Sequence, residues 1–530
     1  MNSRLQPPAT FESKAEFWER LWVKMIRQNI LANMVARAWG VISVYLFVPL
    51  YLKLLGIEAY GIVGFYSTLL AVLAFADMGF TATLNREMAR LSVRKDSAAE
   101  MGDLLRTYES TYLCISSVLA VVVWALAPAI ATHWLRSRVL QPHEMAAAIR
   151  LMGVAISLQL PSALYIGGLM GLEKQVRSNT ITIATSIFRG FGAVLVLWLF
   201  SPTIFAFALW QLISNVVYCL TARFSLWNAL PVRADQSRPH FRWQAFLNTS
   251  HYALGMAGMA AVSALLTQAD KLTVSRMLPL EMLGYYTLAS ALASAPLMLA
   301  SPIALAVFPR LTALVASKDS KEVTRLYHRT SALVAVTTIP TAMTLALFAN
   351  DFIRAWTGSP LAGQRAGVPA GFLLGGQLLQ AIQAVPSYVA LAHGYVRLNL
   401  HVNIASFILI VPLLFFLVMR YGIMGAGVSW LIVTFCTMAP FLYLLHRRFL
   451  PGELGNWLLR DLLRPFLATL PIVLLAHLYF PLPASRLLTL GLIGLVCSMG
   501  AVAAGCSIPE LRLELIAKTS GRLWRSHARQ

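Results

Sequence analysis

The sequence predicts an all-α polytopic membrane protein with about fourteen transmembrane helices, in which two parallel six-helix lobes precede a C-terminal helix pair. Three observations support this fold class: an apolar composition, continuous apolar runs and an internal repeat. Hydrophobic residues make up 58% of the chain and charged residues 12%, whereas soluble domains average roughly 45–50% and 25%. Lipid offers the backbone no hydrogen-bond partners, and runs that do not alternate exclude a β-barrel, which leaves helices.

Each predicted span is an apolar run of about the 20 residues that an α-helix needs to cross a bilayer. The runs fall at residues 29–51, 60–80, 108–130, 148–170, 180–199, 203–222, 246–268, 284–307, 330–349, 368–391, 399–419, 424–445, 463–481 and 487–506. The loops between them are short, so any function must lie among the helices.

Positive charge is spread in short clusters between the apolar runs. The net charge of +21 could suggest nucleic acid, but that partner would require one basic patch with aromatic stacking residues, so we exclude it. Lysine and arginine favour one side of the membrane by roughly threefold, which predicts that both termini are cytoplasmic. Residues 1–28 are predicted to form a cytoplasmic amphipathic segment and residues 511–530 a basic cytoplasmic tail.

An internal repeat relates the first six spans to the next six. Several residues recur at an offset of 223: Glu58 and Glu281, Gly61 and Gly284, Tyr165 and Tyr388, and Gly171 and Gly394. Each half holds an even number of spans, so both copies have the same orientation and an axis along the membrane normal should relate them. Chance matches between such common residues are the alternative. The repeat predicts an N-lobe at residues 29–235, a C-lobe at 236–450 and an additional helix pair at 451–510.

Two arginines lie within predicted spans, where an unpaired charge costs about 2.5–3.5 kcal/mol or more and therefore usually faces a wet cavity. Arg37 lies deep in the first span, on the same face as Asn33, and Arg189 lies in the middle of the fifth. A guanidinium matches a phosphate group with its planar fork, so we predict a cationic, substrate-binding wall. A structural ion pair or a snorkelling side chain is the alternative.

Other polar residues suggest a hydrogen-bonding surface and gates. Gln377, Gln380 and Gln383 share one side of the tenth span and would suit sugar hydroxyls, with contacts between helices as the alternative; Asn403 is predicted to be interfacial. Gating or ion-coupling candidates are Asp77, Arg86, Asp270 and Lys271. Asp77 could pair with Arg86, and Asp270 and Lys271 are expected at the outer end of the seventh span. Glu58 and Glu281 are expected to be carboxylates at helix N-termini.

No catalytic arrangement is present in the sequence. There is no HExxH, GxSxG or P-loop motif and no large outer loop, so we expect a protein that is not an enzyme. The five cysteines lack metal-binding spacing and are expected to be free thiols, and neither a cofactor nor a metal is expected.

Short motifs in a fixed order carry a family resemblance. They are Leu55–Gly61, Ala76–Phe80 running into Leu84–Arg90, Gly171–Lys174, Ala269–Lys271 through Leu283–Tyr286, and Tyr421–Gly427. In this order and spacing the chain resembles the bacterial polysaccharide, or O-antigen type, flippases of the multidrug/oligosaccharidyl-lipid/polysaccharide (MOP) exporter superfamily.

The resemblance implies a V-shaped pair of six-helix lobes around a cationic cavity. It also implies a location in the bacterial inner membrane and a cargo of undecaprenyl-pyrophosphate-linked oligosaccharide, moved from the cytoplasmic to the periplasmic leaflet for surface polysaccharide export. The implied partners are that lipid-linked glycan, membrane lipid and a polysaccharide polymerase or export machinery. Many members of the family have twelve spans, so the extra pair is a departure.

Three alternatives remain open from the sequence. A cation-coupled drug exporter of the same superfamily would need a buried carboxylate, and the carboxylates here lie mainly near interfaces. A peptidoglycan-precursor flippase is closer. A membrane-embedded glycan polymerase or ligase would need a larger outer loop.

Overall fold

The computed structural model describes residues 14–94, 97–231, 239–483, 485–509 and 512, and these form helices and connecting loops without a β-strand. Thirteen of their helical stretches are long and apolar enough to cross a membrane. They match thirteen of the predicted spans one for one. The helix α9 occupies the place of the predicted seventh span, and the side chains of residues 245–260 within it lie outside the described part. The predicted fold class is confirmed.

Two sets of helices follow each other along the chain, and a short third set follows them. The N-lobe contains α1 (Lys14–Leu55), α2 (Ile57–Leu73), η1 (Ala74–Asp77), α3 (Phe80–Ser92), α4 (Ala98–Ala129), η2 (Ile130–Trp134), α5 (Pro142–Ser157), α6 (Gln159–Gly171), α7 (Gln175–Leu199) and α8 (Ile204–Trp227). The C-lobe contains α9 (Trp243–Met277), α10 (Leu280–Ala293), α11 (Ala295–Ala316), α12 (Ser320–Leu347), α13 (Ala349–Thr357), α14 (Pro360–Ala392), α15 (Val396–Tyr421) and α16 (Ile423–Phe449). The additional pair contains α17 (Glu453–Asn456), η3 (Trp457–Leu463), α18 (Arg464–Tyr479) and α19 (Arg486–Ser507).

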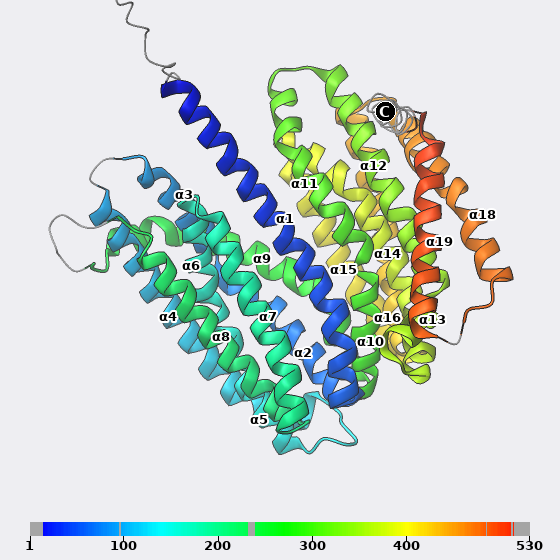
Figure 1. Ribbon diagram of the computed structural model, residues 1–530, viewed down its shortest axis with the longest axis horizontal. Coiled ribbons are helices and arrows are strands. Elements are labelled where there is room, and N and C mark those ends of the chain that lie inside the picture. Colours follow the sequence, from blue (N-terminus) through cyan, green and yellow to red (C-terminus); the bar gives the residue numbers. More distant parts are fainter. Residues whose placement is uncertain (1–13, 95–96, 232–238, 484, 510–511, 513–530) are drawn as a thin grey trace, which may run out of the picture.

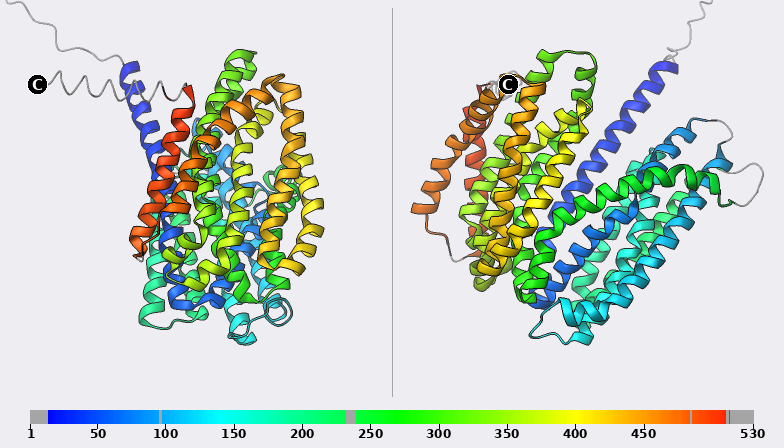
Figure 2. Two further views of the ribbon diagram at one scale, coloured as in Figure 1. Left: turned by 90° about the vertical axis from the view of Figure 1, so that its right-hand side faces the viewer. Right: turned by 180° about the vertical axis from the view of Figure 1, so that it is seen from behind.

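The two lobes form a V. They meet where α2, α5 and α10 lie, here named the converging end, and spread apart toward the end where α1 begins and α19 ends (Figure 1). Two long helices run between the lobes: α1 stands in the opening, and α9 crosses from the converging end toward the far end of the N-lobe (Figure 2). The additional pair packs on α12 and α13 at the side of the C-lobe away from the N-lobe.

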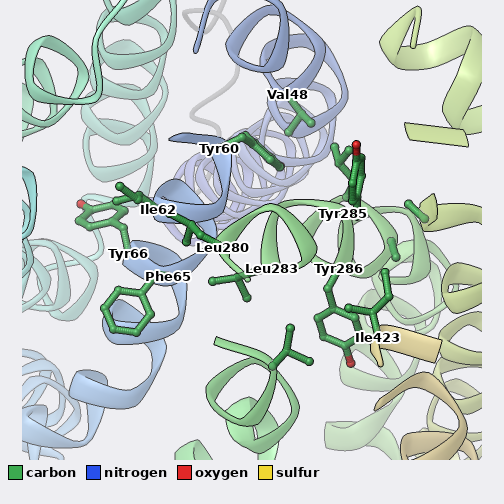
Figure 3. Packing of buried hydrophobic residues seen from close by; sticks show 14 of the residues in the cluster. Val48, Tyr60, Ile62, Phe65, Tyr66, Leu280, Leu283, Tyr285, Tyr286 and Ile423 are labelled. Carbon is green, nitrogen blue, oxygen red and sulfur yellow. The ribbon is translucent and has the colours of Figure 1, made fainter. Parts of the chain in front are cut away.

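The converging end is a close contact between α2 and α10 that obeys the 223-residue repeat. A β-carbon at Gly61 would collide with the backbone of Leu280, and one at Gly284 would collide with the backbone of Ile57. The 223-residue offset relates these two contacts, because it pairs Gly61 with Gly284 and Ile57 with Leu280. Side chains of α2 and α10 pack around the contact (Figure 3). A local two-fold axis therefore relates α2 to α10, as expected of the internal repeat, and the direction of this axis relative to the membrane stays a prediction.

On that axis, Gly64 faces its own repeat partner, Thr287. A β-carbon at Gly64 would collide with the Thr287 hydroxyl. Small residues at both positions allow the two helices to approach closely, which is how membrane helices pack where lipid removes the hydrophobic driving force.

Each lobe carries a polar cluster at its spread end. In the N-lobe, Glu109 is fully buried and accepts hydrogen bonds from Arg223 Nε (2.6 Å), Tyr165 OH (2.7 Å) and Arg106 Nη1 (3.0 Å). A buried carboxylate must be paired in this way to be retained.

The C-lobe cluster is built differently. Its residue at the offset from Glu109 is Ala332, and Tyr327 and His446 form a buried hydrogen bond of 3.0 Å. The carboxylates come from the additional pair, whose Glu453 and Asp461 both contact His328.

Some sequence-based expectations lie outside the described residues. These are most of the terminal tail 511–530, residues 1–13, and the side chains of residues 14–27 in the predicted amphipathic segment. The backbone of α1 is nevertheless one helix from Lys14 into the first span.

Candidate functional site

Arg37 is an unpaired cation near the entrance of the first span. It lies six residues along α1 from Leu31, where the apolar stretch begins, which is about 9 Å along the helix, so it is nearer the end of the span than its middle. Its side chain is exposed, and it forms no ion pair or hydrogen bond with any described residue. This part of α1 stands in the opening between the lobes (Figure 1).

Asn33 serves to attach α1 to α7. Its amide nitrogen donates to Gln175 (2.9 Å), and its amide oxygen accepts from Asn179 (2.6 Å). Nearly two turns further along α1, Trp39 donates to Ser186 (3.1 Å). These hydrogen bonds attach α1 to α7 of the N-lobe. The side-chain amide of Asn33 already has two partners, and its role in substrate binding remains a prediction.

Arg189 lies inside the N-lobe. Its side chain is half-buried and within electrostatic reach of the phenol groups of Tyr51, Tyr66 and Tyr218, from three other helices. No carboxylate of the described residues pairs with it. The guanidinium therefore lies among phenols and not beside a described carboxylate, and its predicted contact with substrate stays a prediction.

A polar cavity of about 310 Å³ lies within the C-lobe. Five helices enclose it, namely α9, α11, α14, α15 and α16. Its polar lining residues are Ser301, Gln380, Gln383, Ser387, Tyr388, Asn403, Ser406, Thr434 and Thr437. All of them are amides or hydroxyls, and none of the lining residues is charged, so the cavity can exchange hydrogen bonds with a neutral polar ligand.

The glutamine row of the tenth span is thus divided. Gln380 and Gln383 line the cavity, whereas Gln377 does not, and its buried Oε1 has no hydrogen-bond partner among the described residues. Asn403, predicted to be interfacial, lies in the cavity wall. Its expected position at the membrane interface stays a prediction.

Trp430 is a cavity residue that the sequence did not single out. Its side chain is buried, and its indole N–H lacks a partner among the described residues. Buried indole N–H groups usually find an acceptor. An unpaired donor in the wall of a polar cavity is suited to a ligand oxygen.

Asp77 lies where the second span breaks. Its carboxylate accepts hydrogen bonds from Tyr112 OH (2.6 Å) and from Thr81, and the chain turns through left-handed Met78 and Gly79 into α3. Arg86 is exposed, and no ion pair joins it to Asp77 in the part of the chain described. The pairing considered from the sequence is absent because Tyr112 and Thr81 satisfy the carboxylate.

Asp270 is more deeply placed than the sequence suggested. The helix α9 continues to Met277, so Asp270 and Lys271 lie about two turns before its end. Asp270 is buried and accepts from Tyr286 OH (2.6 Å) on α10. No described cation pairs with it. Gating or ion coupling by these residues remains a prediction.

At the converging end, the segment 133–139 of the N-lobe is fastened to the C-lobe. Trp134 Nε1 donates to Ser275 Oγ (2.9 Å), Arg276 donates to the carbonyl of His133 (2.7 Å), and Leu280 N donates to the carbonyl of Arg136 (2.7 Å). Sequence reasoning missed this joint, because two of its three acceptors are backbone carbonyls.

Glu58 holds the same segment from within the N-lobe. Its buried carboxylate accepts from Ser137 Oγ (2.5 Å) and from the backbone N–H of Val139 (3.1 Å). Glu58 lies in the first turn of α2, as expected, but its carboxylate holds the loop at segment 133–139.

The chain matches a known protein family over more than half of its length. Residues 52–361 match the family described as "Polysaccharide biosynthesis protein". The chain belongs to this family. The family resemblance drawn from the sequence motifs is confirmed.

Relatives and solved structures agree with the family. The chain is 22% identical over 349 residues to the "Putative O-antigen transporter" of Shigella flexneri, across 66% of this chain and 81% of that one. Its fold is similar to "Lipid II flippase MurJ, inward closed conformation", with a TM-score of 0.70 and 14% identity over 90% of this chain and 98% of that one.

A second fold match is the "Inward-facing conformation of a multidrug resistance MATE family transporter of the MOP superfamily", with a TM-score of 0.63 and 12% identity over 78% of this chain and 95% of that one. Together these matches make this polysaccharide biosynthesis protein a multi-pass membrane protein with the fold of MOP-superfamily transporters.

Proposed function

We propose that the protein is a flippase that moves an undecaprenyl-pyrophosphate-linked oligosaccharide from the cytoplasmic to the periplasmic leaflet by alternating access. The observation that carries the proposal is the pairing of two unlike regions. The exposed Arg37, which pairs with no described residue, lies on the helix that stands in the opening of the V, and an uncharged polar cavity lies in the C-lobe. Both features suit one amphipathic cargo.

The cation favours an anionic cargo. A guanidinium within a spanning segment that has no carboxylate partner is stabilised by water or by an anion. A pyrophosphate offers planar pairs of oxygens that match its fork. The same positive charge would repel the cationic cargo of a drug exporter.

The C-lobe cavity favours a glycan. Sugar hydroxyls donate and accept, and the amides of Gln380 and Gln383 with the neighbouring hydroxyls do the same. The unpaired indole N–H of Trp430 adds a donor, and its ring adds a surface for the apolar face of a sugar. The prenyl tail would stay in lipid.

The converging end supplies a gate for alternating access. The lobes are joined at this end by the α2–α10 contact and by the hydrogen bonds of segment 133–139, and they are open toward the end where α1 begins. Breaking a few hydrogen bonds and one close helix contact would let that end separate while the opposite end closes.

The opening faces the cytoplasm in this proposal, with both termini on that side of the bacterial inner membrane. The bias of lysine and arginine supports it. Reporter fusions should place residue 95 inside and residue 360 outside, and the reverse pattern would overturn the orientation.

A transport assay tests the function. The full chain is reconstituted in proteoliposomes with a fluorescent undecaprenyl-pyrophosphate-linked oligosaccharide, and its transfer between leaflets is followed with an enzyme that modifies only exposed glycan. We expect transfer that depends on the protein and on the glycan, and no release of a cationic dye from the same vesicles. Dye transport without glycan transfer would contradict the proposal.

Two further arms separate the alternatives. A peptidoglycan precursor moved faster than the oligosaccharide would assign the protein to cell-wall synthesis, while a chemically unchanged glycan after transfer is expected of a protein that is not a polymerase or ligase. The proposed partners, a polymerase or export machinery, would receive the cargo on the periplasmic side.

A further inference from the structure

A second polar cavity lies away from the opening between the lobes, where the additional helix pair meets the C-lobe. It has a volume of about 360 Å³ and is lined by α12, by the segment from α17 to α18, and by the residues that follow α19. This volume is at the lower end of the roughly 300–1,000 Å³ typical of ligand sites. Nothing in the proposed transport cycle uses it.

The lining is rich in cations without partners. Lys321 of α12 with Arg460 and Arg464 of the additional pair are exposed, and they form no ion pair with a described residue. Arg325 also lines the cavity and pairs with the exposed Glu322 at 2.9 Å. Guanidinium and ammonium groups that converge on one cavity are suited to an anion.

The carboxylates of the cavity are already engaged. Asp461 contacts His328 Nδ1 at 2.6 Å, and Glu453 contacts His328 Nε2 at 3.1 Å. Because a carboxylate only accepts hydrogen bonds, the two contacts are both satisfied when each ring nitrogen carries a proton. The cationic groups therefore outweigh the acidic ones, and the acidic ones point at the imidazole.

The position of the cavity points to a lipid. It lies at the end of the molecule where the lobes spread apart and where α12 begins, close to the surface of a bilayer that the helices cross. Ala332, Ile508 and Pro509 give it apolar wall beside the charged groups. Basic pockets between membrane helices on the cytoplasmic side are typical sites for anionic lipid headgroups.

We propose that this cavity binds a phosphate group, supplied by the headgroup of an anionic membrane lipid, and that the bound lipid fastens the additional helix pair to the C-lobe. The phosphate bridges Lys321 of the lobe and Arg460 and Arg464 of the pair. This site is separate from the transport cavity and does not depend on the proposed cargo, although its place at the cytoplasmic surface rests on the proposed orientation.

Lipid retention tests the proposal. The full chain is placed in nanodiscs of phosphatidylcholine with or without phosphatidylglycerol, and native mass spectrometry counts the phosphatidylglycerol that remains bound after transfer to detergent. The double variant R460Q/R464Q should retain about tenfold less than the wild type, as expected for the loss of charge-assisted hydrogen bonds. The matched control K174Q/R177Q removes two exposed charges from the N-lobe and should retain as much as the wild type.

Two further measurements make the result decisive. Thermal unfolding in phosphatidylcholine alone should be the same for the double variant and the wild type, whereas phosphatidylglycerol should raise the melting temperature of the wild type only. Saturable binding of inorganic phosphate at millimolar concentration, without retention of phosphatidylglycerol, would assign the site to free phosphate. Equal lipid retention by the double variant and the control, with no phosphate binding, would overturn the proposal.

Discussion

The N-lobe and the C-lobe share one scaffold but place their polar groups at different positions. At the 223-residue offset, Arg37 corresponds to Ala260 and Arg189 to Pro412. The repeat therefore reproduces the helices and the α2–α10 contact, and it does not reproduce the positive charge.

The amides show the reverse difference. Gln380 and Gln383 of the C-lobe cavity correspond to Ser157 and Leu160 in the N-lobe. A symmetric frame thus carries an asymmetric lining, with cations on one side and neutral hydrogen-bonding groups on the other. Such a lining suits a cargo that is itself asymmetric, with a phosphate part and a sugar part.

The largest expected effect comes from reversing the N-lobe charge. Arg37→Glu replaces attraction of a pyrophosphate by repulsion, and transfer of lipid-linked glycan in proteoliposomes should fall about hundredfold, the upper range for a lost charge-assisted hydrogen bond. Arg37→Lys should recover part of the rate. Arg447→Glu, an exposed residue at the end of α16, is the matched control and should keep the rate. Normal transfer by the Arg37→Glu variant would contradict the proposal that Arg37 attracts the pyrophosphate.

The symmetric contact can be broken without touching either lining. Gly64→Ala forces a methyl group onto Thr287, and such overpacking costs about 1–3 kcal/mol. Spin labels on α5 and α10 should report a larger population with the converging end separated. The double variant Gly64→Ala/Thr287→Ala should restore the wild-type distance distribution, and a failure to do so would show that the two residues do not meet.

The polar clusters at the spread ends give a third difference between the lobes. Glu109→Gln leaves Arg106 and Arg223 without their carboxylate. Both arginines are about half exposed and can be solvated, so the free energy of unfolding should fall by only about 1–2 kcal/mol. Thermal unfolding in lipid nanodiscs measures it. The C-lobe has the buried Ala332 at the same offset, beside a polar cavity. Because a serine hydroxyl there can bond to a carbonyl of its own helix, Ala332→Ser should lower the free energy of unfolding by less than about 1 kcal/mol. A larger loss in the C-lobe variant would contradict this assignment.

The smallest effect is expected from the neutral lining. The variant Gln383→Leu removes a hydrogen bond that contributes about 0.5–1.5 kcal/mol net, so affinity for the glycan-bearing lipid should fall about twofold to tenfold. Microscale thermophoresis in detergent measures the affinity. Replacing Gln377, which does not line the cavity, by leucine is the control, and an equal loss there would argue against the cavity as the glycan site.

The sequence predicted the architecture because its signals are local. A run of twenty apolar residues in lipid must form a helix, because only a helix satisfies its backbone hydrogen bonds within the run. Gly61 and Gly284 repeat at the 223-residue offset because a β-carbon at either position would collide with the backbone of the other lobe. The sequence predicts that the seventh span ends at residue 268, whereas α9 continues to Met277. The charges of Asp270 and Lys271 indicate a membrane interface, but the fold provides Asp270 with Tyr286 as a hydrogen-bond partner.

The linings could be predicted only in part. Which residues on a helix face a cavity depends on how neighbouring helices pack, so Gln380 and Gln383 were separable from Gln377 only in three dimensions. Asn33 and Arg37 share a helix face, yet the amide is engaged by Asn179 while the guanidinium is free of any described partner. The joint at segment 133–139 uses backbone carbonyls, which leave no trace in residue identity.

A comparison of binding affinities tests the division between the lobes most directly. Undecaprenyl pyrophosphate with and without its oligosaccharide is titrated against the wild type, Arg37→Ala and Gln383→Leu. The account predicts that Arg37→Ala weakens both ligands by the same factor, whereas Gln383→Leu weakens only the ligand that carries the glycan. Equal losses for both ligands in the Gln383→Leu variant, or unchanged affinity for both in Arg37→Ala, would contradict it.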